Sequence, residues 1–118
     1  MSKHRKTTRP WGSYTVLNTG RGFKVKLVEV LPKHRLSLQK HSFRSEHWVV
    51  VQGEAKIANG KSIFRLKENE STYIPKKITH RLENMTNKPL KIIEVQCGKI
   101  LKETDIYRIA DDHGRILK

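Results

Sequence analysis

Cysteine is almost absent from this sequence, because the 118 residues contain only Cys97. A single thiol cannot form a disulfide within the chain, which excludes the small secreted scaffolds that depend on such bonds. A reducing, cytoplasmic setting is therefore the expected one.

Long apolar runs are missing as well. The longest near-continuous run is Trp48–Val51, far shorter than the ~20 residues that a membrane span needs. The basic start, Met1–Lys6, is not followed by an apolar segment, so it does not fit a secretory signal. The sequence predicts no contact with a membrane.

Acidic residues are also scarce: 11 Asp and Glu stand against 25 Lys and Arg, for a net charge of +14. Such an excess is typical of proteins that bind polyanions such as nucleic acids. Here, however, the basic residues are dispersed, with local density only in residues 3–9 and at Lys76-Lys77. No nucleic-acid-binding motif accompanies them, so nucleic-acid binding is the weakest of the functional hypotheses.

Short β-strands account for most of what is present. Phe23–Leu27 alternates apolar and polar residues, as a half-buried strand does. Comparable segments follow at close spacing, separated by turn residues: Tyr14–Leu17, Leu36–Gln39, Glu46–Val51, Ala55–Ala58, Ser62–Leu66, Ser71–Ile74, His80–Asn84 and Leu90–Gln96. Many short strands in one small chain predict an all-β double-sheet jelly roll.

The two ends of the chain differ from this pattern. Residues 1–8 are basic and polar and are expected to be a flexible N-terminus, with a single domain over residues 9–118. Near the other end, Thr104 fits the cap of a short helical segment over Asp105–Asp111.

Two segments carry residues suited to metal binding. In an extended chain, side chains two residues apart share a face, so Gln39 and His41 point the same way. Glu46 begins the next strand after a short turn, and His80 begins a later strand after a proline-led turn. One amide oxygen, one carboxylate and two imidazoles suit Zn²⁺, Fe²⁺, Co²⁺ or Mn²⁺ and leave coordination positions open.

These segments resemble the two cupin motifs. Gln39-x-His41, Glu46 and Gly53 match the first motif in the variant with glutamine in place of its first histidine. Asn69, Pro75, His80 and Asn84 match the second motif, with Asn69 in the glycine position. Further segments that occur in order resemble the type II phosphomannose isomerase domain, which is often the C-terminal part of bifunctional mannose-1-phosphate guanylyltransferases: Arg9–Tyr14, Arg44–Trp48, Ile93–Gly98 and Asp111–Arg115. The resemblance covers roughly residues 9–115.

The resemblance implies a cupin double-stranded β-helix and one divalent metal ion, zinc first, with cobalt, manganese or iron as alternatives. It implies the metal ligands Gln39, His41, Glu46 and His80. The implied activity interconverts mannose 6-phosphate and fructose 6-phosphate through a cis-enediol, supplying mannose for sugar nucleotides and polysaccharides. A homodimer is also implied. The glycine-rich nucleotide loop of the bifunctional relatives is absent from the sequence, so nucleotidyl transfer is not expected.

Arginines are the candidates for handling the substrate. Arg44 and Arg115 are expected to bind the phosphate, since guanidinium groups match its geometry, and Arg115 could act in catalysis from a tail that closes over the site. Arg81 and His47 are further catalytic candidates, although strand alternation turns both away from the metal. The proton-transfer base stays open between a metal-bound water, His47 and a tail residue. The alternative function is a non-catalytic metal cupin that binds a sugar or sugar phosphate; a sugar-nucleotide epimerase is a more distant one.

Overall fold

The computed structural model describes residues 4–114, and these residues form strands joined by turns, with no helix. The strands, in chain order, are β1 (Lys6–Arg9), β2 (Gly12–Gly20), β3 (Phe23–Val30), β4 (Leu38–Lys40), β5 (Arg44–Gln52), β6 (Ala55–Asn59), β7 (Ser62–Leu66), β8 (Ser71–Ile74), β9 (His80–Glu83), β10 (Leu90–Gly98) and β11 (Tyr107–Ala110). The part of the chain that the structure describes therefore includes no helix that could cross a membrane.

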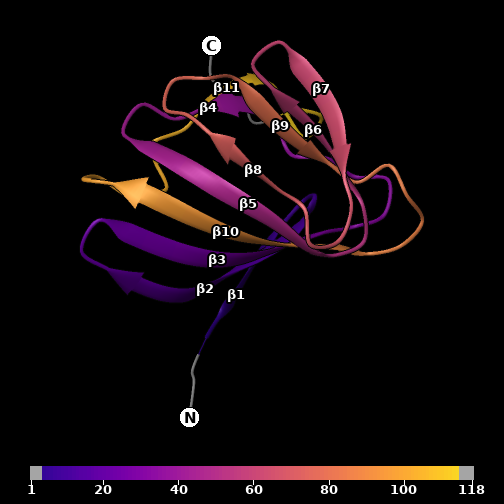
Figure 1. The fold of residues 1–118 in the computed structure, drawn as a ribbon, viewed down its shortest axis with the longest axis horizontal. Coiled ribbons are helices and arrows are strands. Elements are labelled where there is room, and N and C mark those ends of the chain that lie inside the picture. The colour runs from indigo at the N-terminus through magenta and orange to yellow at the C-terminus, as the bar shows by residue number, and fades with distance from the viewer. Residues whose placement is uncertain (1–3, 115–118) are drawn as a thin grey trace.

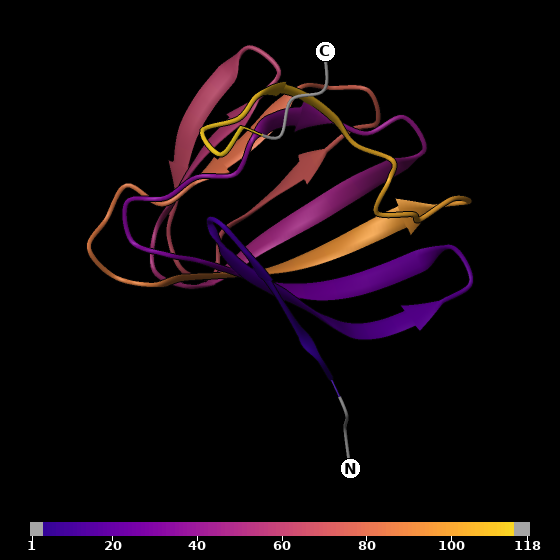
Figure 2. The same ribbon diagram turned by 180° about the vertical axis from the view of Figure 1, so that it is seen from behind.

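The strands form two sheets that face each other (Figures 1 and 2). The six-stranded sheet has the order β1-β2-β3-β10-β5-β8, and the five-stranded sheet has the order β11-β4-β9-β6-β7. All of these neighbours pair in antiparallel fashion. This double-sheet arrangement confirms the all-β jelly roll that the strand spacing predicts.

Strand alternation decides which side chains enter the space between the sheets. On β5, Trp48 and Val50 are buried whereas His47 is exposed. Ile57 on β6 and Leu82 on β9 meet them from the five-stranded sheet as members of the same buried apolar cluster. Each such side chain contributes ~1.5–3 kcal/mol through burial.

Polar side chains replace the apolar ones toward one end of this interior. On β10, buried Leu90 and Ile92 are followed on the same face by Glu94 and Gln96. Gln96 pairs in register with the buried Glu46 of β5. The apolar end stabilises the fold, and the polar end is the place for a functional site.

The predicted helix over Asp105–Asp111 is wrong, because Tyr107–Ala110 forms β11 instead. Its exposure alternates with a period of two, and Arg108 pairs with Gln39 of β4. The pairing satisfies backbone groups on the outer edge of β4 that would otherwise need another partner. Tyr107 and Ile109 are also residues that strands favour.

The N-terminal segment is more ordered than its composition predicts. Lys6–Arg9 pairs with β2, so residues 6–8 lie in a strand and not in a flexible end; residues 1–3 are outside the described part of the chain. The pairing uses backbone groups, so polar side chains do not oppose it. Lys6 adds an ion pair with Glu29, with Nζ and Oε2 3.1 Å apart.

Candidate metal centre

Three of the four predicted ligands meet at the polar end of the interior. His41 follows β4, Glu46 lies on β5, and His80 begins β9. Their ligand atoms all lie within 4.8 Å of one another, and all three side chains are buried. Two histidines and a carboxylate brought together from three strands form a plausible site for a divalent ion.

Each imidazole is oriented by a backbone carbonyl. His41 Nδ1 donates to the Asp105 oxygen at 2.6 Å, and His80 Nδ1 donates to the Ile78 oxygen at 3.0 Å. A carbonyl oxygen can only accept, so the proton is assigned to Nδ1 and the lone pair to Nε2 of each ring. Metal-binding histidines are held in this way by a second hydrogen bond.

Burial also keeps the two rings in the state that binds metals. It lowers the pKa of His41 to about 4, with the positive charge of Arg44 as a smaller cause. It lowers the pKa of His80 as well. Both rings are therefore neutral at pH 7, as a metal ligand must be.

Glu46 completes the cluster from β5. Its Oε1 accepts a hydrogen bond from Trp48 Nε1 at 2.8 Å. Its Oε2 lies 3.2 Å from His41 Nε2, so two atoms with lone pairs face each other. Positive charge stabilises such a pair; the guanidinium of Arg44 supplies it in this structure, and a divalent ion would also supply it. Two imidazole nitrogens and a carboxylate are a donor set that fits a divalent ion.

Arg44 lies in this cluster and not apart from it. Its Nε donates to Glu46 Oε2 at 2.7 Å, and its Nη2 is 3.2 Å from His41 Nε2. A third contact joins Nη1 to the Lys102 oxygen at 3.3 Å. The predicted substrate-binding arginine is thus placed beside the candidate metal ligands, where it stabilises the negative charge of Glu46.

Gln39, the fourth predicted ligand, lies next to the cluster. It is buried on β4 and pairs in register with His80 on β9. Its Nε2 is 3.4 Å from the Ser37 oxygen, which orients the amide and leaves its oxygen for the cavity. The structure therefore brings all four predicted ligands to one place.

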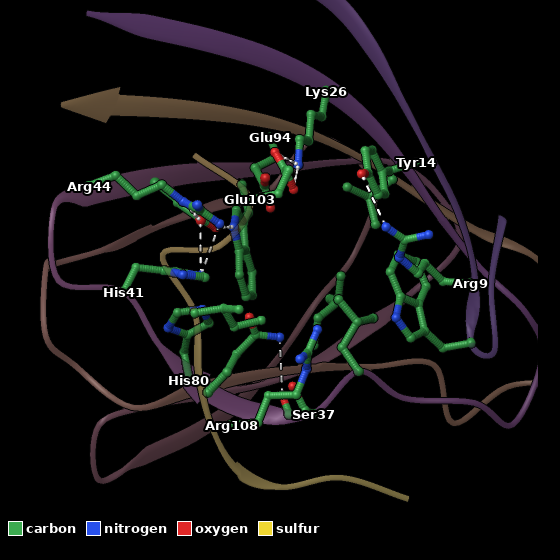
Figure 3. Close-up of a pocket in the computed structure, with 18 residues that line it drawn as sticks. Arg9, Tyr14, Lys26, Ser37, His41, Arg44, His80, Glu94, Glu103 and Arg108 are labelled. Carbon is green, nitrogen blue, oxygen red and sulfur yellow. Dashed lines mark hydrogen bonds and ion pairs between the residues drawn. The ribbon is translucent and has the colours of Figure 1, made fainter. Parts of the chain in front are cut away.

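A cavity of about 110 Å³ opens in front of these residues. Its walls combine cations, acids and apolar side chains from both sheets, as Figure 3 shows. Its polar and charged wall also includes Arg9, Tyr14, Lys26, Glu94, Glu103 and Arg108, and Ile106 lies among them. Apolar side chains, among them Trp11, Leu36 and Leu82, form other parts of the wall.

Sequence reasoning did not identify Glu94 as a site residue. Its location in the cavity raises the pKa of its carboxyl to about 7, chiefly because water is excluded and secondly because Glu46 is negative. Gln96 Nε2 donates to Glu94 Oε2 at 2.8 Å. The signal was present in the sequence, because Glu94 shares a strand face with Ile92 and Gln96.

Lys26 was missed for a related reason. Only 4% of it is exposed, and Nζ is 2.7 Å from Oε1 of Glu103. Its buried neighbours on the same strand face are Val28 and Val30. Alternation over Phe23–Leu27 alone cannot show that the face of Lys26 is the inner one.

Two of the catalytic candidates, His47 and Arg81, do not line the cavity. His47 is exposed on the opposite face of β5, with its ring centroid 4.8 Å from that of Tyr73. Arg81 donates to the Leu36 and Ala110 oxygens at 3.1 Å each, and so ties β9 to neighbouring segments. Strand alternation is the reason in both cases. Arg115 lies outside the described residues.

The sequence closely resembles parts of larger biosynthetic proteins. It is 50% identical over 112 residues to the xanthan biosynthesis protein XanB of Xanthomonas campestris, which covers 95% of this chain and 24% of that protein. It is 48% identical over 113 residues to the mannose-1-phosphate guanylyltransferase of Escherichia coli, with 96% and 24% covered. The chain thus spans about a quarter of the length of these curated relatives.

Solved structures show a similar fold. A conserved protein with a double-stranded β-helix domain from Klebsiella pneumoniae superposes with a TM-score of 0.70 at 16% identity, covering 95% of this chain and 90% of that one. The fold is therefore the cupin double-stranded β-helix that the motifs predict. Residues 1–111 match the family described as "Mannose-6-phosphate isomerase C-terminal". With this match and relatives close to half identical over nearly the whole chain, the protein belongs to the mannose-6-phosphate isomerase C-terminal domain family.

Proposed function

We propose that this chain is a metal-dependent isomerase that interconverts mannose 6-phosphate and fructose 6-phosphate. The observation that carries the proposal is the buried group of His41, Glu46 and His80 beside a cation-lined cavity, in a member of this family. The polysaccharide-related names of relatives such as XanB support a role in supplying mannose for polysaccharide synthesis.

The reaction moves a proton between C2 and C1 of an open-chain sugar. A divalent ion held by Gln39, His41, Glu46 and His80, with zinc as first choice and cobalt, manganese or iron as alternatives, would supply positive charge beside the oxygens on C1 and C2 and so favour the cis-enediol.

The chain's own residues contribute three further things. Arg44, held beside the ligands, can donate hydrogen bonds to sugar oxygens that gain negative charge. Trp48 fixes the Glu46 carboxylate through its indole N–H. Glu103 and Ile106, from the segment before β11, form part of the cavity wall and limit the entry of water.

A coupled assay that follows fructose 6-phosphate formation from mannose 6-phosphate tests this function. Protein treated with a chelator should be inactive and should regain turnover with Zn²⁺, Co²⁺, Mn²⁺ or Fe²⁺. His80→Ala should lose turnover, whereas His34→Ala, a change at a half-buried histidine outside the cavity, should keep it. Absence of turnover in the metal-loaded parent would favour the non-catalytic alternative, a metal cupin that binds a sugar phosphate.

We further propose that the protein works in the cytoplasm as a homodimer. The single cysteine and the biosynthetic names of the relatives support the first point. Within the described residues, β1 lies at the edge of the six-stranded sheet, where a second copy could pair with it. Sedimentation equilibrium should give twice the chain mass, and a monomer at all concentrations would contradict the dimer.

A further inference from the structure

A second basic region lies across the cavity from the metal ligands. Figure 3 shows Arg9 and Tyr14 on the side opposite His41 and His80. In the sheet order, β2, which carries Tyr14, is three strands from β5, which carries Glu46. At ~4.8 Å per strand, the backbones of these two strands are about 14 Å apart. Arg9 and the candidate metal ligands therefore lie on opposite sides of the same cavity.

Among the residues that the structure describes, Arg9 is a cation of the cavity without a carboxylate partner. Lys26 is paired with Glu103, and Arg44 with Glu46. Within residues 4–114, by contrast, no ion pair involves Arg9, whose Nη1 donates to the Thr8 oxygen at 3.0 Å. Its positive charge is thus available to an anion in the cavity.

The side chain of Arg9 is exposed but contacts Tyr14. Its guanidinium carbon lies 5.3 Å from the centroid of the Tyr14 ring, and Nη2 is 3.5 Å from the Tyr14 hydroxyl oxygen. Stacking on an aromatic ring leaves the edge of a guanidinium group free to donate hydrogen bonds. An anion beside Arg9 would meet those donors.

The backbone that carries Arg9 is fixed by its neighbours. Arg9 pairs with Gly12 across the turn formed by Pro10 and Trp11, and Trp11 is buried in the core. A β-carbon at Gly12 would collide with the Glu29 carbonyl oxygen. The pairing at Gly12 and the buried Trp11 therefore fix the position of the Arg9 backbone relative to the core.

We propose that Arg9, with the Tyr14 hydroxyl beside it, binds the phosphate group of a sugar phosphate whose other end lies at the metal ligands. Guanidinium and phosphate match in a bidentate arrangement. The assignment moves phosphate binding from Arg44, which is engaged by Glu46 and the Lys102 oxygen, to the opposite end of the cavity. The identity of the sugar rests on the proposed function, whereas the phosphate contact does not.

Titration calorimetry with mannitol 6-phosphate tests the site, because this open-chain probe carries the phosphate but no carbonyl and cannot be turned over. Mannitol is the probe without phosphate. Arg9→Ala should weaken binding of mannitol 6-phosphate about 10- to 100-fold and leave the response to mannitol unchanged. Arg9→Lys, which keeps the charge but not the fork of donors, should lie between Arg9→Ala and the parent.

Lys6→Ala is the matched control, since it removes one positive charge from the same strand outside the cavity. It should bind mannitol 6-phosphate like the parent, and thermal unfolding should show that every variant is folded. Equal binding of mannitol 6-phosphate by Arg9→Ala and the parent would overturn the proposal. So would a parent protein that binds the phosphorylated and unphosphorylated probes equally.

The two proposals fail in different ways. Binding of mannitol 6-phosphate that depends on Arg9, in a parent without turnover, would support the phosphate site and contradict the isomerase. Turnover with an unchanged kcat/KM for mannose 6-phosphate in Arg9→Ala would support the isomerase and overturn the phosphate site.

Discussion

Asp105 connects the segment before β11 to the proposed metal ligand His41, and its removal should weaken metal binding at that site. Its backbone oxygen accepts the hydrogen bond from His41 Nδ1 at 2.6 Å. Its carboxylate accepts from the backbone N–H groups of Ser42 and Phe43 at 2.8 and 2.9 Å. Asp105→Ala keeps the carbonyl but removes the two contacts that hold it against His41.

The magnitude follows from these contacts. Two partly exposed hydrogen bonds to a carboxylate, together worth ~1–2 kcal/mol, correspond to a fall in Tm of about 4–8 °C for a chain of this size. Loss of a group that orients a metal-binding histidine typically lowers metal affinity ~10–100-fold. Competition with a chromophoric zinc chelator measures the affinity, and calorimetry measures Tm.

Asp112→Ala serves as the control, because it removes an aspartate from the same C-terminal region whose partner is Arg35, away from His41. It should leave the zinc affinity at the parent value. If Asp105→Ala binds zinc as tightly as the parent while its Tm falls, the prediction is wrong, because the carboxylate then stabilises the fold without orienting His41.

Two further predictions concern stability. In the metal-free protein, burial raises the pKa of Glu94 from its ordinary 4.5 to about 7, so ionisation costs stability as the pH rises from 4.5 to 7. Glu94→Gln removes this cost, which reaches up to about 3 kcal/mol in the free energy of unfolding. In urea unfolding, the variant should therefore gain stability relative to the parent as the pH rises from 5 to 8. A stability difference that does not change with pH would contradict this. At Gly53 the φ angle is +90° and a β-carbon would lie 2.7 Å from the Pro89 oxygen, so Gly53→Ala should cost about 1–3 kcal/mol. Gly60→Ala, where φ is +61° and the nearest side-chain atom is 3.5 Å away, should cost less in the same thermal unfolding measurement.

The strands that carry the fold could be predicted because their patterns are local. Ser62–Leu66 and Ser71–Ile74 have the predicted bounds, and most of the others differ by one to three residues at an end. The strand Tyr107–Ala110 could not be predicted in this way, because it forms by pairing with distant Leu38–Lys40. Its polar, charged surroundings resemble a helix end when only neighbouring residues are considered.

The meeting of the four candidate ligands could be predicted because their spacing is specific. Gln39, His41, Glu46 and His80 are recognised by two motifs at once, and strand alternation gives the shared face. Lys26, Glu94 and Arg9 required the structure, since their role depends on which sheet face is enclosed and which partners each charge finds. A shift of strand register by one residue would move every inward-facing side chain to the outer face of the sheet.

The placement of His47 and Arg81 illustrates the same rule. Alternation already turned both away from the metal, and in the structure neither lines the cavity. The family resemblance had retained Arg81 as a catalytic candidate. Strand alternation therefore predicted correctly that these two side chains point away from the cavity.

The proposed metal site is tested most directly by the metal content of protein purified without a histidine tag. Elemental analysis should find one divalent ion per chain in the parent and in His34→Ala. Gln39→Ala, His41→Ala and His80→Ala should each hold much less after the same dialysis, with circular dichroism showing that they are folded. Variants that retain as much metal as the parent would contradict the proposed site, and with it the mechanism.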